Sequence, residues 1–516
     1  MSDANAPESG PTAQRIVIVG FGPVAARLIE HLEPLVASGL AAVTVIGEEP
    51  HAAYNRVLVA DVAVGRTQEN AIRLADAAAL VAHGIDVRLH ARVARVDRPF
   101  RRVLLEDGQE VAYDRLVLAT GSRPVLPRLE GVDPAALPPG VSFLRDITDA
   151  RLLAEAMAAD QRIVVLGGGI LGIEAALAAA EEGARVTLVH TGRAPMERYL
   201  GDGARVLGTA LSRTGITVVG GSSTGITVDE DGRFTGLTLK DERHVEGGAL
   251  VIACGVRPRT ELADGCDLNT AAGILVDHDL RALDTTDIWA IGDCAEIRCW
   301  DAACESCSGV TAPLGLIAPG WQQADQLGDA FAAELTAAQN ADAIAVAPAG
   351  PPDRRGALLL LKARGVDAVT AGETDADPWS VEPGLAVAVW TDPGHGRYAK
   401  MITRDGVLTG LVCVGMPRTG AELVLLFERG SELPADRSSL LRLDSLEGAA
   451  AALPPGPDAT LCRCAGITRG VVEESVKAGC ATVRDVSQGT RAGTGCGTCH
   501  SEIRAVIEQY FSVATA

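Results

Sequence analysis

Residues 161–190 read QRIVVLGGGILGIEAALAAAEEGARVTLVH, which is an apolar strand, a glycine-rich turn, an alanine-rich helix and a second apolar strand. The turn fits G-x-G-x-x-G, a pattern whose glycines let the backbone approach a pyrophosphate at the helix N-terminus. Residues 15–49 repeat the same order, with RIVIVG, the turn GFGPVA and the strand AAVTVIGEE. The repeat predicts one α/β fold used twice, as two Rossmann-like nucleotide-binding domains.

Each turn supplies a set of candidate nucleotide-binding residues. The first turn and the strand after it supply Gly20, Gly22, Ala25 and Glu48. The second turn supplies Gly167, Gly169 and Gly172. His190 stands where NAD-binding domains often carry an acid for the ribose, and the nearby Arg193 could meet a 2′-phosphate or be a solvated loop charge. The choice between NADH and NADPH therefore stays open, with NADH preferred.

Composition excludes several classes of partner. The chain of 516 residues has a net charge of −21 and only 3% aromatic residues, which disfavours nucleic acids and anionic membranes. The N-terminus lacks the pattern of a signal peptide, and no apolar run approaches the roughly 18 residues of a membrane helix. We expect a cytoplasmic protein, in which the twelve cysteines serve clusters, metals or catalysis rather than disulfides.

Four cysteines near the C-terminus form two close pairs, in LCRC and GTGCGTC: Cys462, Cys464, Cys496 and Cys499. Four thiolates can hold a [2Fe–2S] cluster, and structural zinc takes the same set. The end of this pattern, up to His500, also fits the C-x-x-C-H motif of haem attachment. Haem attachment occurs outside the cytosol and leaves the first pair unused, so a [2Fe–2S] cluster and zinc remain the alternatives, and the close spacing of the cysteines suits a cluster held in loops at helix ends. Cys480 between the pairs is expected to be a buried apolar residue.

A second group of cysteines follows the motif GDCAE: Cys294, Cys299, Cys304 and Cys307. Thiolates so close together repel one another, and a cation relieves the repulsion. The sequence leaves two alternatives open, a second Fe–S or zinc centre or a loop with free thiols.

The ordered motifs GFGPVA, LATGSRP, GGGILGIE and AIGDCAE resemble the pyridine-nucleotide flavoprotein oxidoreductases. The resemblance implies FAD on the first turn and NAD(P)H on the second. For FAD it adds Thr120, Gly121, Gly292 and Asp293, and for NAD(P)H it adds Glu174. The motifs EEPHAAYNRVLV, MERYL and GLIAPGWQQA are similar to the N-terminal half of the assimilatory nitrite reductase large subunit and to the assimilatory nitrate reductase electron-transfer subunit. Arg56 would then lie near the flavin, the alternative for Tyr54 and Arg56 being ordinary surface packing.

The cysteine pattern LCRC…GTGCGTC resembles the bacterioferritin-associated ferredoxin-like [2Fe–2S] domain. With this resemblance, the expected parts are a disordered tail, a split FAD domain, an inserted NAD(P) domain, a smaller α/β interface domain and a small helical [2Fe–2S] domain. In that order they cover residues 1–14, 15–149 with 246–335, 150–245, 345–450 and 458–516.

These resemblances imply a reductase that passes electrons from NADH through FAD and [2Fe–2S] to a partner. The expected partner is the molybdenum-dependent catalytic subunit of assimilatory nitrate reductase. The chain has no C-x5-C-x3-C pattern for sirohaem, so we expect the step on nitrogen to occur on another polypeptide. The alternatives are a ferredoxin or rubredoxin reductase of an oxygenase system, and a redox-sensing binding protein with little turnover.

Overall fold

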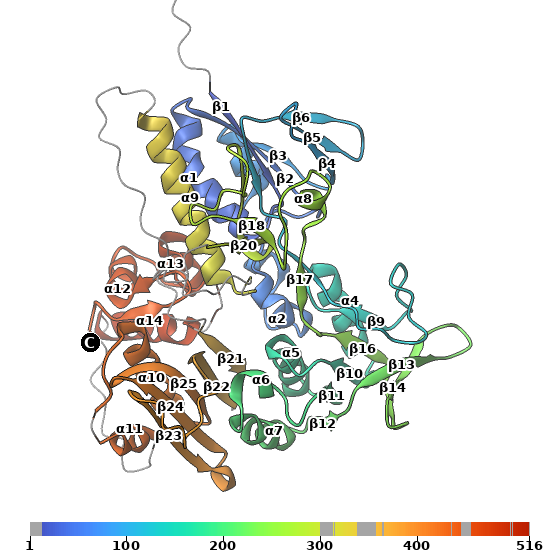
Figure 1. Cartoon of the computed structure of the whole chain (residues 1–516), viewed down its shortest axis with the longest axis vertical. Helices are drawn as coiled ribbons and strands as arrows, with labels where there is room; N and C mark the ends of the chain where they lie inside the picture. Colours follow the sequence, from blue (N-terminus) through green and yellow to red (C-terminus); the bar gives the residue numbers. More distant parts are fainter. Residues whose placement is uncertain are drawn as a thin grey trace, which may run out of the picture.

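The computed structural model describes residues 13–299, 313, 315–337, 358–363, 366–434, 436–444, 456–495, 497 and 499–514. Its first domain contains a parallel sheet with the strand order β19-β7-β1-β2-β3. In chain order the strands are β1 (Gln14–Val19), β2 (Ala41–Ile46), β3 (Asp86–Arg88), β7 (Arg115–Leu118) and β19 (Ile288–Ala290). Helices α1 (Pro23–Ala37) and α9 (Ile317–Ala337) run side by side against this sheet (Figure 1).

Helix α1 begins where the first glycine-rich turn ends. Pro23 occupies its first turn, where a missing N–H costs nothing, and Gly22 is its N-cap. The helix buries Leu28, Ile29 and Leu32, an apolar stripe with helical spacing, in the core of the first domain. This packing fixes the helix N-terminus at the carboxyl edge of the sheet.

The second domain repeats the arrangement, with the strand order β12-β11-β10-β16-β9 and all neighbours parallel. Its strands are β9 (Val141–Phe143), β10 (Ile163–Leu166), β11 (Val186–His190), β12 (Thr217–Gly220) and β16 (Ala249–Ile252), and helix α5 (Ile170–Glu181) follows the second turn. The sheet extends beyond the predicted range 150–245 at both ends, since β9 and β16 belong to it. Sequence pattern assigns both to the first domain because a short apolar run does not reveal its neighbour in a sheet. The division of the whole chain into domains stays a prediction.

Smaller elements connect and flank the two parallel sheets. The strands β8 (Ser122–Pro124) and β17 (Val256–Pro258) form an antiparallel pair where the chain passes between the domains. Two small antiparallel sheets contain β4 (Val93–Asp97), β5 (Arg102–Leu105) and β6 (Glu110–Ala112), and β13 (Ser223–Val228), β14 (Phe234–Leu239) and β15 (His244–Glu246). The remaining elements near the sites are η1 (Arg56–Leu58), α2 (Val59–Ala63), α3 (Ala77–Ala82), α4 (Ile147–Ala158), α6 (Glu197–Leu200), α7 (Gly203–Arg213), α8 (Glu261–Asp264), β18 (Ile274–Val276), η3 (Gly292–Cys294) and β20 (Ala295–Ile297).

The third domain is an antiparallel sheet with the order β21-β22-β25-β24-β23. Its elements are β21 (Leu359–Ala363), β22 (Val366–Gly372), β23 (Leu385–Asp392), β24 (Arg397–Arg404), β25 (Val407–Val414), α10 (Pro417–Arg429) and α11 (Ser438–Leu441). Leu423 and Phe427 of α10 are buried with the sheet in a core of their own. Tyr398 and Val412 instead belong to the core of the second domain, so the sheet packs against that domain.

The C-terminal domain is small and mostly helical, and it lies between α9 and α10 (Figure 1). It contains β26 (Thr460–Cys462), β27 (Ile467–Thr468), α12 (Arg469–Lys477), α13 (Val483–Thr490) and α14 (His500–Ala514). Its core is formed by Val472, Val476, Val486, Ile503 and Val506, together with Cys462 and Cys499.

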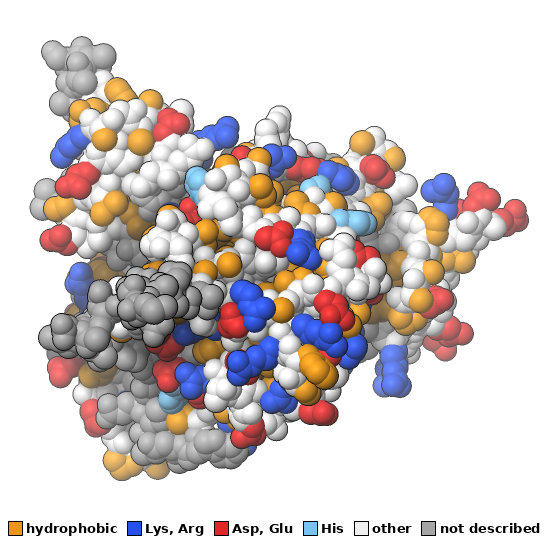
Figure 2. All heavy atoms as spheres, turned by 90° about the horizontal axis from the view of Figure 1, so that it is seen from above, with side chains coloured by type: hydrophobic (Ala, Val, Ile, Leu, Met, Phe, Trp, Pro, Cys, Tyr) orange, Lys and Arg blue, Asp and Glu red, His pale blue; other side chains and the backbone are white. Residues whose placement is uncertain are grey.

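The surface carries both signs of charge. On the face shown in Figure 2, basic and acidic side chains are interspersed rather than gathered by sign. Within the part of the chain that the structure describes, no helix is both long and apolar enough to cross a bilayer. The arrangement confirms the fold class, with two Rossmann-like domains, a smaller α/β domain and a helical cysteine domain.

Candidate nucleotide and cluster sites

The first glycine-rich turn leaves an open cradle at the N-terminus of α1. Gly20 has φ +104°, and a Cβ added there would lie 2.2 Å from the carbonyl oxygen of Ala119, so only glycine fits. At Gly22 an added Cβ would meet nothing within 4 Å, and no side chain caps the helix. Open space, uncapped N–H groups and the positive end of the helix dipole fit a diphosphate. Ala25 is fully buried one turn further on.

Glu48 lies at the same edge of the sheet, just after β2. The guanidinium of Arg259 donates a hydrogen bond of 2.6 Å to the Glu48 carboxylate, which is about half exposed. Thr120 donates to the backbone oxygen of Arg259 at 3.0 Å, and Gly121 follows with φ +69°. The structure thus brings the three predicted FAD residues of this edge together through Arg259, which sequence reasoning missed.

Asp293 lies in a polar network beside the sheet. Its carboxylate accepts hydrogen bonds from Ser122 at 2.7 Å and from Arg145 at 3.2 Å. Burial lowers the pKa of Arg145, and the charge of Asp293 opposes this shift without cancelling it. The preceding Gly292 has φ +77°, and its N–H donates to the side chain of Gln323 at 2.7 Å. The family resemblance predicted Asp293 and Gly292, whereas their three side-chain partners, Ser122, Arg145 and Gln323, come from distant segments.

Arg56 belongs to a compact group of polar side chains. It forms an ion pair with Glu49, and its guanidinium lies 5.0 Å from the centre of the Tyr54 ring. The Tyr54 hydroxyl donates to the same carboxylate at 2.7 Å. Burial alone would raise the pKa of Glu49, but Arg56 and the Tyr54 hydrogen bond outweigh it, and the pKa falls below its usual value. Arg56 and Tyr54 are therefore joined through the carboxylate of Glu49, and the place of Arg56 near the flavin stays a prediction.

The second glycine-rich turn has the same geometry as the first. Gly167 has φ +135°, and an added Cβ would lie 2.2 Å from the carbonyl oxygen of Ala253. At Gly169 an added Cβ would again meet nothing within 4 Å, and no side chain caps α5. A Cβ on Gly172 would lie 2.0 Å from the oxygen of Gly167, so the helix is packed tightly on its own turn. This cradle also fits a diphosphate.

The end of β11 carries the residues expected to face the nicotinamide nucleotide's ribose. His190 is only 4% exposed, and its Nδ1 lies 3.1 Å from the carbonyl oxygen of Thr191. The backbone N–H of Arg193 donates to Glu197 at 2.9 Å, and its guanidinium pairs with the same carboxylate. Arg193 is thus engaged by Glu197, a residue the sequence did not single out. Glu174 lies in α5, behind the second turn.

Three of the four predicted cluster ligands lie in the C-terminal domain's core region. The Cys462 and Cys464 sulfurs are 3.7 Å apart, and the N–H of Gly493 donates to the Cys462 sulfur at 3.4 Å. The Cys464 hydrogen bond lowers the pKa of Cys462, but Cys499 and burial raise it and prevail, so the Cys499 thiol also interacts with Cys462. Cys496 lies outside the described residues. Clustered thiols with a backbone donor fit the sulfur set of a [2Fe–2S] centre.

The remaining predicted metal ligands are placed only in part. Cys294 is fully buried, and its sulfur lies 3.3 Å from the carbonyl oxygens of Leu118 and Ile291. Cys304 and Cys307 lie outside the described residues, while Cys299 ends the described segment. Among the described side chains, no group of three or more His, Cys, Asp or Glu is arranged to hold a metal ion. That set omits Cys496 as well as the loop, so the second centre stays a prediction.

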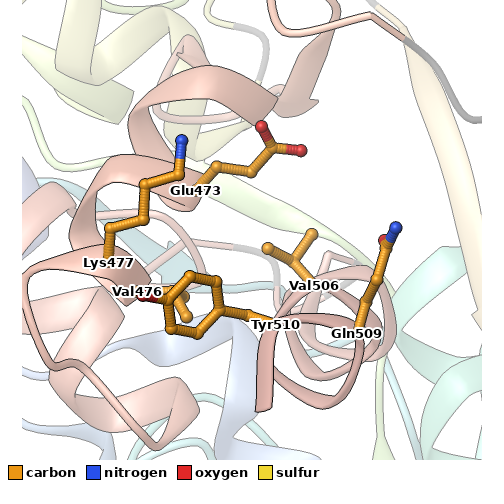
Figure 3. A pocket seen from close by; sticks show the side chains of 6 residues that line it. All are labelled: Glu473, Val476, Lys477, Val506, Gln509 and Tyr510. Carbon is orange, nitrogen blue, oxygen red and sulfur yellow. The ribbon is translucent and has the colours of Figure 1, made fainter. Parts of the chain in front are cut away.

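A cavity of about 260 Å³ lies between α12 and α14. Figure 3 shows its lining side chains, which are Glu473, Val476, Lys477, Val506, Gln509 and Tyr510. None of these is a predicted cofactor residue. The volume is below the roughly 300 to 1,000 Å³ typical of small-molecule pockets, and we assign it no role.

Comparison with known proteins now adds to this geometry. Residues 14–307 match the family described as pyridine nucleotide-disulphide oxidoreductase, which is more than half of the chain. The chain belongs to this family. Residues 460–509 match the BFD-like [2Fe-2S] binding domain. Membership implies FAD and NAD(P)H as cofactors, and the second match implies a [2Fe–2S] cluster. The first cysteine of the oxidoreductase is Cys254, so its first domain brings no dithiol to the flavin before that position.

Two curated relatives cover almost the whole chain. A Bacillus subtilis (strain 168) protein named nitrite reductase, NAD(P)H, is 29% identical over 96% of this chain and 57% of its own length. The assimilatory nitrate reductase electron transfer subunit of the same organism is 27% identical over 94% of this chain and 58% of its own length. The oxidoreductase thus spans little more than half the length of these relatives.

A solved structure shows the same fold. The covalent putidaredoxin reductase–putidaredoxin complex superposes with a TM-score of 0.68 at 20% identity, covering 84% of this chain and 98% of that chain. This structural similarity also confirms the predicted fold class.

Proposed function

We propose that this flavoprotein is the electron-transfer subunit of an assimilatory nitrate reductase and carries electrons from NADH to a separate catalytic subunit. One observation carries the proposal. The chain joins an FAD domain, an NAD(P)H domain and a [2Fe–2S] domain, and the last touches the first directly through the hydrogen bond of Asn55 to the backbone of Thr494, 2.6 Å long.

In this proposal, the protein's own backbone and side chains bind and orient the cofactors. Gly20, Gly22 and Ala25 form the cradle for the FAD diphosphate, with Glu48 at the ribose and Asp293 at the flavin side. Gly167, Gly169 and Gly172 form the cradle for NAD(P)H. Cys462, Cys464, Cys496 and Cys499 hold the cluster. When bound, these groups would supply hydride and one-electron chemistry, which the protein's own residues do not provide.

The partner in the proposal is the molybdenum-dependent catalytic subunit, and the expected compartment is the cytoplasm. The support is the name of a relative that aligns with 94% of the chain, an assimilatory nitrate reductase electron transfer subunit. The ion pair of Arg193 with Glu197 supports a preference for NADH. The guanidinium is already paired, so it is less able to bind the 2′-phosphate of NADPH.

Reconstitution tests this function. The holoprotein is mixed with a purified assimilatory nitrate reductase catalytic subunit from the same organism, and NADH oxidation is followed with and without nitrate. The proposal predicts nitrate-dependent NADH oxidation that requires both proteins. Rapid NADH–ferricyanide turnover with no nitrate-dependent oxidation in the mixture would contradict the proposed partner and favour a ferredoxin or rubredoxin reductase. Absence of any turnover would favour the redox-sensing alternative.

A further inference from the structure

Asn55 connects the flavin domain to the C-terminal domain from a buried position. It is 1% exposed, and its Nδ2 donates to the backbone oxygens of both Thr494 and Gly495. Its Oδ1 accepts from the N–H of Val57 at 3.0 Å and caps η1. Both polar atoms of this amide are therefore hydrogen-bonded. The oxygen accepts from its own domain, and the nitrogen donates to a loop 439 residues further along the chain.

The same loop carries contacts to the cysteine pair. We define the cluster loop as residues 493–495. The N–H of Gly493 donates to the Cys462 sulfur, and a Cβ added to Gly495 would lie 2.3 Å from the Cys464 sulfur. A displacement of the cluster loop would therefore change the surroundings of both the Cys462 and the Cys464 sulfur.

Trp321 of α9 reaches the cluster loop from a second side. A Cβ added to Gly495 would lie 3.2 Å from the Trp321 ring, so the ring lies next to Gly495 and leaves no room there for a larger residue. The indole N–H donates to the backbone oxygen of Pro23 at 3.1 Å. Pro23 follows Gly22 in the first glycine-rich turn. One buried side chain therefore spans the distance between the FAD cradle and the cluster loop.

Asn55 also adjoins the polar group beside the predicted flavin. It lies between Tyr54 and Arg56, which share the Glu49 carboxylate, and Glu49 follows Glu48 of the FAD site. Ion pairs of Arg491 with Glu30, and of Arg463 with Glu428 at 4.0 Å, join the C-terminal domain to α1 of the flavin domain and to α10 of the third domain. Unlike these partly exposed pairs, the Asn55 amide and the Trp321 indole are buried.

We propose that Asn55 and Trp321 are positioning residues that dock the cluster loop on the flavin domain, so that the cluster is reduced by the flavin of the same chain across this contact. The inference rests on the proposed function and goes further by assigning the site of internal electron transfer. For each hydride that the flavin would take from NADH, two electrons would pass one at a time to the cluster and on to the acceptor protein, and one proton would leave to solvent. NADH supplies the electrons.

The substitution Asn55→Asp tests the proposal because it separates the two roles of the amide. A carboxylate still accepts from Val57, but it cannot donate and would set negative charge against two carbonyl oxygens. In the holoprotein, hydrogen exchange of residues 493–495 is expected to rise, and cluster reduction after mixing with NADH is expected to slow by about tenfold or more. Flavin reduction by NADH, followed at its own wavelength, is expected to keep the wild-type rate. Asn55→Ser, which keeps a hydroxyl for the cap, is expected to act in the same direction.

Asp76→Ala is the matched control, since it removes the side-chain cap of α3 in the same domain without touching the cluster loop. It is expected to leave both rates and the exchange of the loop unchanged. The proposal is overturned if cluster reduction in Asn55→Asp and Asn55→Ser stays fast while exchange rises, if slowing occurs without a rise in exchange, or if neither changes. If NADH reduces the flavin but never the cluster in the wild type, the proposed function itself fails, independently of Asn55.

Discussion

Gly22 and Gly169 occupy equivalent positions in two domains. Each leaves open space beside a helix N-terminus that no side chain caps. Gly22→Val places a branched side chain in the first cradle, so FAD binding should weaken by more than about tenfold, roughly 1.4 kcal/mol. Flavin absorbance of the purified protein measures this loss.

Gly169→Val is the reciprocal control for that substitution. It should keep full flavin but lose reduction by NADH, since only the second cradle is filled. Retention of full flavin by Gly22→Val would show that FAD is not bound at the first turn.

Asp149 gives a prediction for pH. It belongs to the capping box at the start of α4, and burial together with the charge of Asp146 raises its pKa to about 6. A carboxyl group with a raised pKa favours the folded state while protonated, and that contribution is lost as the pH rises through the folded pKa. The wild type therefore loses stability at this position between about pH 4 and pH 6, by about 3 kcal/mol.

Asp149→Asn stays neutral, so its melting temperature relative to the wild type should rise over that interval, as followed by flavin release on heating. Asp485→Asn in the capping box of α13 should show the opposite trend, because the Thr482 hydrogen bond lowers the pKa of Asp485. A flat difference for Asp149→Asn from pH 4 to pH 7 would rule out the raised pKa.

At the scale of the element, the turn from β11 into α6 sets the charge beside the predicted site of the nicotinamide nucleotide's ribose. Glu197, the first residue of α6, accepts from the backbone and side chain of Arg193. Glu197→Gln should free the guanidinium for a 2′-phosphate and raise the ratio of kcat/KM for NADPH over NADH by about two- to fivefold, the size of an exposed ion pair. The double substitution with Arg193→Ala should remove the gain. An unchanged ratio in Glu197→Gln would mean that Arg193 does not contribute to the discrimination between NADPH and NADH.

The elements differ in how far the sequence predicts them. The two glycine-rich turns were predictable because strand, turn and helix are local in the chain and steric limits admit only glycine at Gly20 and Gly167. The placement of β9 and β16 in the second sheet was not, because parallel neighbours are set by crossovers between distant segments. Local pattern decides an element, and long-range pairing decides its sheet.

The candidate sites show the same division. Asp293 follows from the motif AIGDCAE, but its partners Ser122 and Arg145 lie 171 and 148 residues away in sequence. Asn55 and Trp321 stand inside AYNRVL and APGWQQA, motifs that indicated only a resemblance until the structure placed both against the cluster loop. The sequence does show Asn55 between the aromatic Tyr54 and the charged Arg56, but it does not show that the amide is buried.

At the scale of the whole molecule, the C-terminal domain lies against the flavin domain and beside α10 rather than standing apart (Figure 1). In the proposed function, this contact would let electrons pass from the flavin domain to the cluster domain of the same chain. No separate electron-carrier protein would then be required between these two domains.

An anaerobic titration of the holoprotein with NADH tests the central claim most directly. Flavin absorbance is recorded together with the EPR spectrum, after iron, sulfide and zinc have been measured. The account predicts that NADH bleaches the flavin and produces the signal of a reduced [2Fe–2S] cluster, with Cys462→Ser keeping the bleaching and losing the signal. Zinc without sulfide in the wild type, or a flavin that NADH bleaches while the cluster stays oxidised, would contradict it.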